Sequence, residues 1–249
     1  MAMKYIIGID VGTTGTKTML FRETGSPVSH AYRAYSTKNC RVGESEQDAN
    51  DWWRAIVETV REVTSDSDVA KNIAAISLST QGGTVVPVDS DGEPLRPAIV
   101  WNDTRFIEER ELFISEVGAP EILYEKTGWA LGNNLPLLAI RYIKDKEPEI
   151  FSKTAAFLTV PSYVSMKMTG RAVVDISNAG IEQLTDVRRG EYDEALLNFA
   201  GVEKSRLAPI FPSGTAVGKL TRVAASELGI SEDALFVTGA HDQYAVALG

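Results

Sequence analysis

One short stretch near the start of the chain, IIGIDVGTTGTK, concentrates residues that could do chemistry. It contains an acid, two glycines around two threonines, and a lysine: Asp10, Gly12, Thr13, Thr14, Gly15 and Lys17. The stretch is not a P-loop, because Thr16 separates Gly15 from Lys17. It is not a dinucleotide-binding loop either, because no glycine stands two residues before Gly12. From the residues alone, a turn acid beside ordinary β-forming threonines explains the stretch as well as a functional site does.

The composition limits what such a site could bind. The chain has 249 residues, of which 44% are hydrophobic and 24% charged, as in an ordinary soluble globular protein. Its net charge of −9 argues against nucleic-acid and anionic-membrane partners, which need a basic surface. Any phosphate must therefore be held locally, by backbone N–H groups, one or two cations and a metal ion.

Cysteine usage and hydropathy indicate the compartment. The single cysteine, Cys40, cannot form an internal disulfide and fits a reducing environment. No segment approaches 18 consecutive apolar residues, and strand-like sequence begins at Lys4, which leaves no room for a signal peptide. We therefore expect a cytoplasmic location.

The elements that must position the turn begin with a hairpin. The pattern predicts strands over 4–11, 15–23 and 27–36, a polar loop over 38–48, a helix from Asp48 through DANDWWRAIVETVREV, and a buried strand over 73–80. Three meandering strands, a helix and a buried strand follow the order of the ribonuclease-H-like core of actin-like ATPases. The predicted fold class is thus α/β, with a mixed sheet flanked by helices.

The rest of the chain is mixed. Further strands are expected in GTVVPVD and PAIVW, helices in 104–118, 135–151, 192–200 and 220–228, and strands in TAAFLTV and ALFVTGA. Another helix should open at Pro161 and stop at Gly170, with proline near its start and glycine just past its end. We find no repeat, linker or internal boundary, so one domain over 1–249 is predicted.

Six blocks, in order, resemble the N-terminal domain of the FGGY carbohydrate kinases over the whole chain. They are GIDVGTTGTK, ESEQDANDWW, STQGG, LRPAIVWNDTR, VVDISNAG and GAHDQYAVALG. The second block departs from the family pattern, because Ala49 replaces the usual proline. The resemblance implies an enzyme that transfers a phosphoryl group from ATP to a sugar or polyol hydroxyl, with Mg²⁺.

The resemblance also implies roles for the chemistry-bearing residues. The Gly12–Gly15 turn would present backbone N–H groups and two hydroxyls to a phosphate, and Asp10 would hold Mg²⁺ through water. Lys17 could add positive charge, although strand alternation could equally turn it to solvent. Asp242 would be the general base that takes the proton of the sugar hydroxyl, and a helix N-cap is its structural alternative.

Substrate identity is harder to predict. A ketopentose such as xylulose is expected, yet Gln81 is followed here by Gly82 and Gly83 instead of the Met-His of xylulokinases or the Arg-Glu of glycerol kinase. Two glycines offer backbone groups and extra room, or only a plain turn. Further substrate contacts are expected from polar residues in two loops, Asn102, Asp103, Asn133 and Asn134.

Several other residues have structural interpretations. Trp52 and Trp53 fit the apolar face of their helix, so core packing is preferred to a sugar platform. Asp175 and Asn178 are interpreted as structural. Glu46 could reach the site or only support its loop, and His241 could touch substrate or simply pack.

The resemblance further implies a missing partner. FGGY kinases resemble two actin-like domains that close on ATP and sugar, and the second domain supplies most of the adenosine pocket. Since this chain stops at Gly249, within an expected helix, we interpret it as the sugar-binding part of a longer protein, with Met1-Ala2 added before a native Met3. Homodimer formation is left open. The alternatives are an actin-like ATPase or chaperone module and a ribonuclease-H-type nuclease, the latter opposed by the −9 charge.

Overall fold

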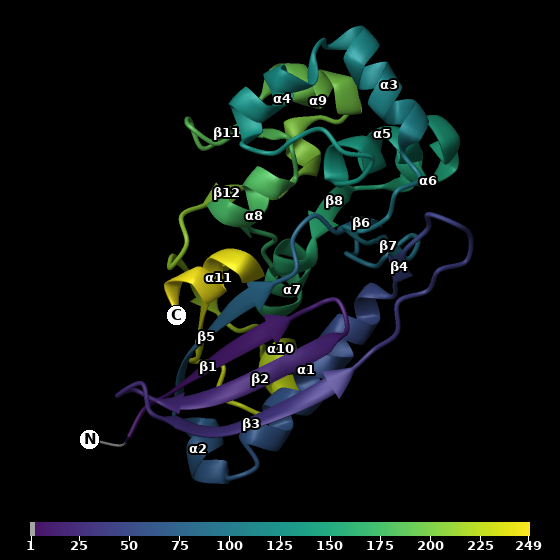
Figure 1. Ribbon diagram of the computed structural model, residues 1–249. Helices are drawn as coiled ribbons and strands as arrows, with labels where there is room; N and C mark the ends of the chain where they lie inside the picture. The colour runs from purple at the N-terminus through teal and green to yellow at the C-terminus, as the bar shows by residue number, and fades with distance from the viewer. Residues whose placement is uncertain (1–2) are drawn as a thin grey trace.

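The largest sheet, with six strands, carries the N-terminal hairpin. The computed structural model describes residues 3–249, so the expected addition at Met1-Ala2 lies outside the described residues. The sheet contains β1 (Tyr5–Val11), β2 (Gly15–Arg22), β3 (Pro27–Ala34), β5 (Ile73–Thr80), β13 (Ala216–Lys219) and β14 (Leu235–His241). Its order is β13-β14-β5-β1-β2-β3, with β1, β5 and β14 parallel and β2, β3 and β13 antiparallel to their neighbours (Figure 1). The predicted mixed sheet is confirmed.

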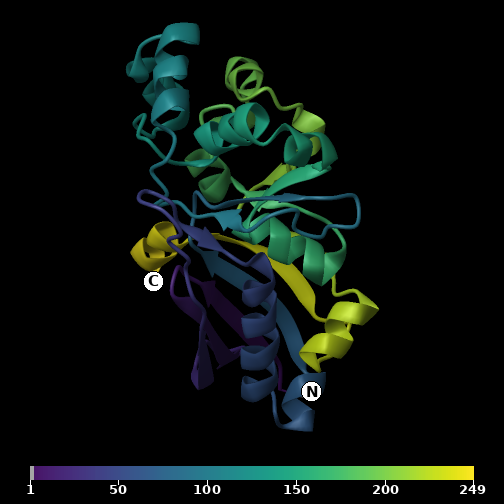
Figure 2. The same ribbon diagram turned by 90° about the vertical axis from the view of Figure 1, so that its right-hand side faces the viewer.

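One face of this sheet is covered by helices. Helix α1 (Ala49–Val63) lies against β2 and β3 beside α10 (Arg222–Leu228), and α2 (Ser67–Lys71) follows α1 (Figure 2). Trp52, Ile56 and Val60 recur at helical spacing and are completely buried. Each such side chain contributes roughly 1.5–3 kcal/mol of burial free energy. Trp52 therefore belongs to the core, while Trp53 is half-buried and donates its indole N–H to Glu227 at 2.7 Å.

The opposite face of β1 and β2 is not covered by any helix of residues 3–249, as both views show (Figures 1 and 2). Residues of β1 alternate between the two faces, so that Ile7, Ile9 and Val11 point into the core while Asp10 is exposed. The turn of the hairpin and the open face that carries Asp10 are therefore both accessible to a ligand.

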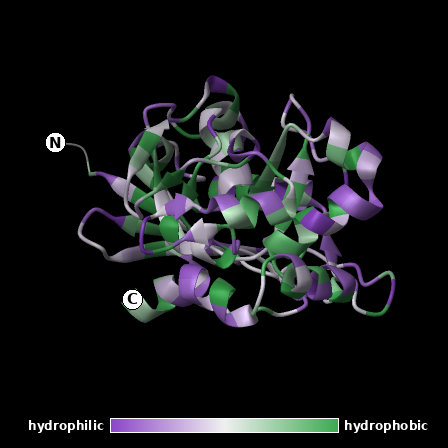
Figure 3. Ribbon diagram, turned by 90° about the horizontal axis from the view of Figure 1, so that it is seen from above, coloured by the Kyte–Doolittle hydropathy of each residue, from purple (hydrophilic) through white to green (hydrophobic). Residues whose placement is uncertain are grey.

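A smaller four-stranded sheet makes a second layer among the described residues. Its strands β4 (Glu46–Gln47), β7 (Ala98–Ile99), β6 (Val85–Val88) and β8 (Ala156–Thr159) lie in that order. Around it pack α3 (Ile107–Glu116), α4 (Pro120–Thr127), α5 (Pro136–Lys146), α6 (Pro148–Lys153) and α9 (Glu194–Ala200). A second apolar cluster fills this layer, and Figure 3 shows hydrophobic residues along the inner strands and helices, with hydrophilic residues in the rim loops.

The helical run predicted over 135–151 is broken in the structure. It divides into α5 and α6 at Glu147, because Pro148 disfavours helical geometry in the residue before it and lacks an N–H donor. Helix α4 was not predicted. The single-domain expectation stays a prediction. The smaller sheet contributes residues to both apolar clusters, with Val86 and Leu158 in the first and Val85 and Phe157 in the second.

The layers are joined by α7 (Val160–Thr169), which opens with a Thr159 capping box and ends at Gly170 (φ 73°), as the proline–glycine pattern predicts. The remaining elements are β9 (Val174–Asp175), α8 (Ile176–Ile181), β10 (Thr185–Asp186), β11 (Glu191–Tyr192), a 3₁₀ turn (Lys204–Arg206), β12 (Ile210–Phe211) and α11 (Asp242–Leu248). Within residues 3–249, no helix has the length and apolarity needed to cross a bilayer.

Candidate active site

Three side chains fix the Gly12–Gly15 turn by donating hydrogen bonds to its carbonyl groups. The Tyr35 hydroxyl donates to the carbonyl of Gly12 at 2.6 Å, the Gln47 amide to that of Thr13 at 2.6 Å, and the Tyr32 hydroxyl to that of Thr14 at 3.1 Å. The backbone N–H groups of Thr13 and Thr14 donate to no group within residues 3–249. The turn therefore presents free donors at its tip, an arrangement that suits an anion.

Glycine stands at positions 12 and 15 of the turn for different reasons. A Cβ on Gly15 would lie 2.4 Å from the Tyr32 hydroxyl and 2.5 Å from the Arg33 carbonyl, so β3 itself excludes a side chain there. A Cβ on Gly12 would meet nothing nearer than 3.5 Å, and its φ lies outside the left-handed region. The chain's own packing does not require glycine at 12, which leaves space where a phosphate could approach the backbone.

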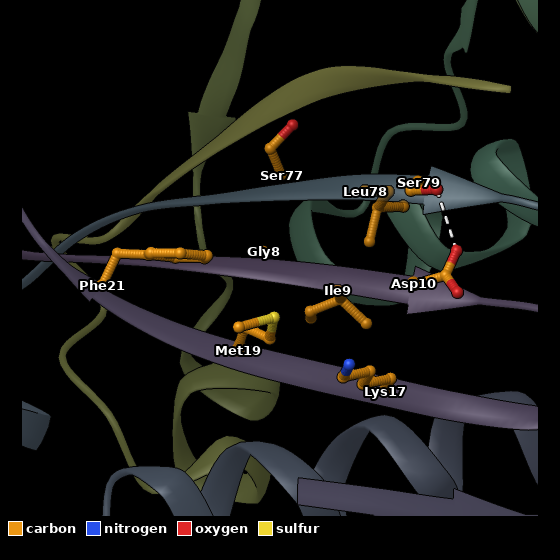
Figure 4. A pocket seen from close by; sticks show the side chains of 9 residues that line it. All are labelled: Gly8, Ile9, Asp10, Lys17, Met19, Phe21, Ser77, Leu78 and Ser79. Atoms are coloured by element: carbon orange, nitrogen blue, oxygen red, sulfur yellow. Dashed lines mark hydrogen bonds between the residues drawn. The ribbon is translucent and has the colours of Figure 1, made fainter. Parts of the chain in front are cut away.

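Asp10 and Lys17 are cross-strand partners on the open face of the sheet (Figure 4). They line a shallow groove with Ser79, whose hydroxyl donates to Asp10 Oδ1 at 2.8 Å. The described residues contain no cluster of three metal-ligating acids, histidines or cysteines. A single carboxylate with open space beside it fits Mg²⁺, which keeps several of its waters. Strand alternation does expose Lys17, but on the same face as Asp10.

A cavity of about 310 Å³ lies beside the turn. It is lined by Thr13, Gln81, Gly82, Trp101, Trp129, Ala130, Asn134, Leu135, Ile181, His241, Asp242 and Gln243. Five of these were predicted from the sequence as site residues: Thr13, Gln81, Gly82, Asn134 and Asp242. Loops far apart in the chain thus converge on one pocket.

Sheet topology explains that convergence. Val11 pairs with Thr80 across β1 and β5, and Thr80 pairs with His241 across β5 and β14. The carboxyl ends of three adjacent parallel strands therefore meet, and the turn, Gln81 and Asp242 follow directly from them. Open α/β sheets bind ligands at this edge.

Hydrogen bonds connect the Gly12–Gly15 turn to the pocket. The Thr13 hydroxyl donates to Gln81 Oε1 at 3.2 Å and accepts from the Trp101 indole N–H at 3.0 Å. Gln81 donates in turn to Gln47 Oε1 at 2.9 Å, which also accepts from Trp52. Gln47 was not predicted as a site residue, although it stands in the ESEQDANDWW block.

Asp242 is the first residue of α11 and His241 is its N-cap, so Asp242 is not the cap itself. Its Oδ1 accepts the Gln243 backbone N–H at 2.6 Å, and its side chain is 39% exposed toward the pocket. A carboxylate that is partly exposed on a pocket wall can accept a proton from a bound hydroxyl.

Four expected substrate contacts are not supported by their positions. Asp103 is completely buried and accepts from the Ser45 N–H at 2.7 Å and from Arg105 at 2.6 Å, so it holds the loop instead of lining the pocket. Asn102 is exposed and does not line the cavity. Gly83 is buried and does not line the cavity, and its φ of +68° is a conformation that itself favours glycine. Asn133 does not line the cavity either.

The extra room expected at the glycine pair is not open. A Cβ on Gly83 would lie 2.6 Å from Leu135 Cδ2, and one on Gly82 would lie 2.3 Å from His241 Cδ2. Neighbouring side chains already occupy the space that the two glycines leave.

Glu46 and Asp175 have the supporting contacts that their structural interpretations predict. Glu46 forms ion pairs with Arg96 and with Arg105 (2.9 Å), which support the loop. Asp175 caps α8 by accepting from the N–H groups of Ser177 and Asn178.

The pocket also contains residues that sequence reasoning missed. The most prominent are Trp101 and Trp129, two indoles on its wall. Trp101 stood in the WNDTR block and could have been found there, whereas Trp129 follows an unpredicted helix. Leu135 adopts φ +80°, a strain of roughly 1–3 kcal/mol of the kind that clusters at functional sites. Asn134 donates to the Trp101 carbonyl at 2.9 Å and so fixes that wall.

Comparison with known proteins gives a consistent picture. A sequence profile described as "FGGY family of carbohydrate kinases, N-terminal domain" matches residues 5–249. Xylulose kinase of Bacillus subtilis (strain 168) is 34% identical over 248 residues, covering 99% of this chain and 49% of that protein. Gluconokinase of the same strain is 28% identical, covering 98% and 47%. The crystal structure of xylulose kinase from Rhodospirillum rubrum matches with a TM-score of 0.93 at 28% identity, covering 98% and 50%. The chain spans about half the length of the curated relatives it matches.

Proposed function

The chain belongs to the FGGY family of carbohydrate kinases, and from that premise we propose that the protein transfers the γ-phosphoryl group of ATP to a hydroxyl of a sugar or polyol. One observation carries the proposal. Thr13 belongs both to the turn with free N–H donors and to the wall of the pocket that contains Asp242. A phosphate on the turn and a hydroxyl in the pocket would therefore be neighbours.

The residues of this chain divide the work of the reaction. The hydroxyl oxygen bonds to the γ-phosphorus, the bond from that phosphorus to the β–γ bridging oxygen breaks so that ADP leaves, and Asp242 takes the hydroxyl proton. The turn would donate N–H groups to phosphate oxygens, and Asp10 would hold a water-bound Mg²⁺ with Lys17 as a nearby cation. When bound, ATP would supply the transferred phosphoryl group, and Mg²⁺ would neutralise the negative charge of its oxygens. Gln81 and Asn134 offer amides to the other hydroxyls of the substrate, and the indoles offer apolar faces to its C–H groups.

We further propose that the substrate is a ketopentose such as xylulose. Gluconate is the second candidate, because a gluconokinase is among the relatives. The described lining of the pocket contains no lysine or arginine, so a carboxylate would find no cationic side chain there. That composition favours an uncharged polyhydroxy substrate.

The partner of this domain is proposed to be the C-terminal domain of the same protein. It would supply most of the adenosine pocket and close over the open face that carries Asp10. The 249-residue chain alone should then show no turnover, while sugar binding should survive better than ATP binding in calorimetry.

The test is a kinase screen of the full-length protein with D-xylulose, L-xylulose, D-ribulose, gluconate and glycerol, monitored by ADP release. An Asp242→Asn preparation controls for contaminating host kinases. Sugar-dependent ADP release with a ketopentose preferred over gluconate is expected. ATP hydrolysis that is indifferent to every sugar would instead indicate an actin-like ATPase.

A further inference from the structure

His241 is enclosed at the edge of the pocket, directly beside Asp242. Its side chain is only 5% exposed, and its ring meets Trp129 and Tyr244 edge-on, with centroids 6.4 Å and 5.8 Å away. Its backbone N–H donates to the Ser177 hydroxyl at 2.9 Å, which fixes the end of β14. The imidazole is therefore held in one place, although sequence reasoning gave it no definite role.

Gly82 is matched to that imidazole. A Cβ on Gly82 would lie 2.3 Å from His241 Cδ2 and 2.8 Å from both His241 Nε2 and Ile181 Cγ2. Since the φ of Gly82 lies outside the left-handed region, its backbone does not require glycine. The ring of His241, together with Ile181, is what excludes a side chain at 82.

The surroundings of the ring indicate its tautomer. Nδ1 is buried and has no partner among the described residues, whereas Nε2 lies 3.3 Å from Asp242 Oδ1. A hydrogen on Nδ1 would leave a buried N–H unpaired, so the neutral ring carries its hydrogen on Nε2. Burial lowers the pKa of His241, which favours this neutral form, although Asp242 and Asp175 oppose the shift.

We propose that His241, seated on Gly82, is a positioning residue for Asp242. Its Nε2–H donates to Asp242 Oδ1 once substrate is bound, and the other oxygen, Oδ2, then faces the reacting hydroxyl. The present 3.3 Å separation lacks the alignment of a hydrogen bond. Catalytic hydrogen bonds are often long or poorly aligned without substrate and tighten in the complex. The inference rests on the proposed function, because it assigns Asp242 as the base.

Two variants of nearly equal size separate donation from packing. His241→Gln places an amide N–H near the position of Nε2, whereas His241→Leu fills the space without a donor. In the full-length protein, His241→Leu should lower kcat about 10–100-fold, since misplacing a reacting group by about 1 Å has that effect. The KM for ATP should stay unchanged, and His241→Gln should recover most of kcat. His30→Gln, the same change at an exposed position on β3, should leave kcat unchanged.

A double-mutant cycle tests the pairing with Gly82. Gly82→Ala should displace the imidazole and lower kcat in the wild-type background, but should change kcat little once His241→Ala has removed the ring. The Ile181 contact is present in both backgrounds, so it cancels from the coupling.

A measurement without catalysis keeps the two proposals distinguishable. The chain has only two histidines, so ¹⁵N NMR of the 249-residue chain, with His30→Gln for assignment, reports the tautomer of His241 directly. A neutral Nε2–H form is expected at pH 7, and a hydrogen on Nδ1 would overturn the inference. The inference would also be overturned if His241→Leu and His241→Gln lost kcat equally, if both retained the wild-type kcat, or if only the KM for the sugar changed. If no sugar is phosphorylated by the wild-type protein, the proposed function fails while the NMR result still decides the tautomer.

Discussion

Exchanging each glycine of the hairpin turn for alanine separates its structural role from its binding role. In Gly15→Ala the new methyl would lie 2.5 Å from the Arg33 carbonyl and 2.4 Å from the Tyr32 hydroxyl, so β3 must move. Overpacking of this kind costs about 1–3 kcal/mol of unfolding free energy. For a domain of this size, that corresponds to a Tm lower by roughly 2–12 °C.

Gly12→Ala should behave in the opposite way. Its methyl would meet no atom nearer than 3.5 Å and would lie 4.0 Å from Asp10 Oδ2. Because the backbone tolerates alanine, the unfolded state loses entropy and stability should be unchanged or higher by about 0.4–1 kcal/mol. The methyl would nevertheless occupy the space proposed for the phosphate, so kcat/KM for ATP should fall about 10²-fold.

Both variants are compared by thermal melting and by the coupled ADP assay on the full-length protein. The expected pattern is a stable, nearly inactive Gly12→Ala and a destabilised Gly15→Ala. Full ATP-dependent activity in Gly12→Ala would refute the assignment of this turn as the phosphate site.

Three further outcomes are expected. Asp242→Asn should lower kcat by about 10²–10⁴-fold at unchanged Tm, because the amide cannot accept the hydroxyl proton; a lowered Tm with normal kcat would assign it to helix stability. Asp103→Asn should destabilise the domain by roughly 3–5 kcal/mol in denaturant titrations, because it breaks a buried pair with Arg105, while the sugar KM stays unchanged. Burial raises the pKa of Glu182 to about 8, so the folded chain holds a proton that the unfolded chain releases above about pH 4.5. Stability should therefore fall between about pH 4.5 and 8, and chemical denaturation of Glu182→Gln should show a flatter pH dependence.

The regular core could be predicted from the sequence because its periodicities are clear. β1 alternates buried Ile7 and Ile9 with outward residues, and α1 repeats Trp52, Ile56 and Val60 on one face. The two-residue strands β4 and β7 are too short to show any period, and α4 has only a weak apolar face. These elements form because the neighbouring layer holds them.

The candidate site was predictable where a motif follows a strand. The turn after β1 and Asp242 after β14 both stand at such positions. The side chains that fill the pocket depend on contacts between distant segments, which no local pattern contains. Asp103 illustrates the limit: its loop position suggested a ligand contact, whereas Ser45 and Arg105 occupy both of its oxygens.

The parallel pairing of β5 with β14 also shapes how the chain can fold. Ala75 pairs with Leu235, and every strand and helix of the smaller layer except β4 lies between them in the sequence. During synthesis, one edge of β5 therefore stays without its native neighbour until Leu235 has left the ribosome. An unpaired edge is a template for wrong pairing, and such non-local contacts fold slowly. We expect ribosome-bound chains that end before β14 to need chaperone protection, because their unfinished sheet is exposed to aggregation.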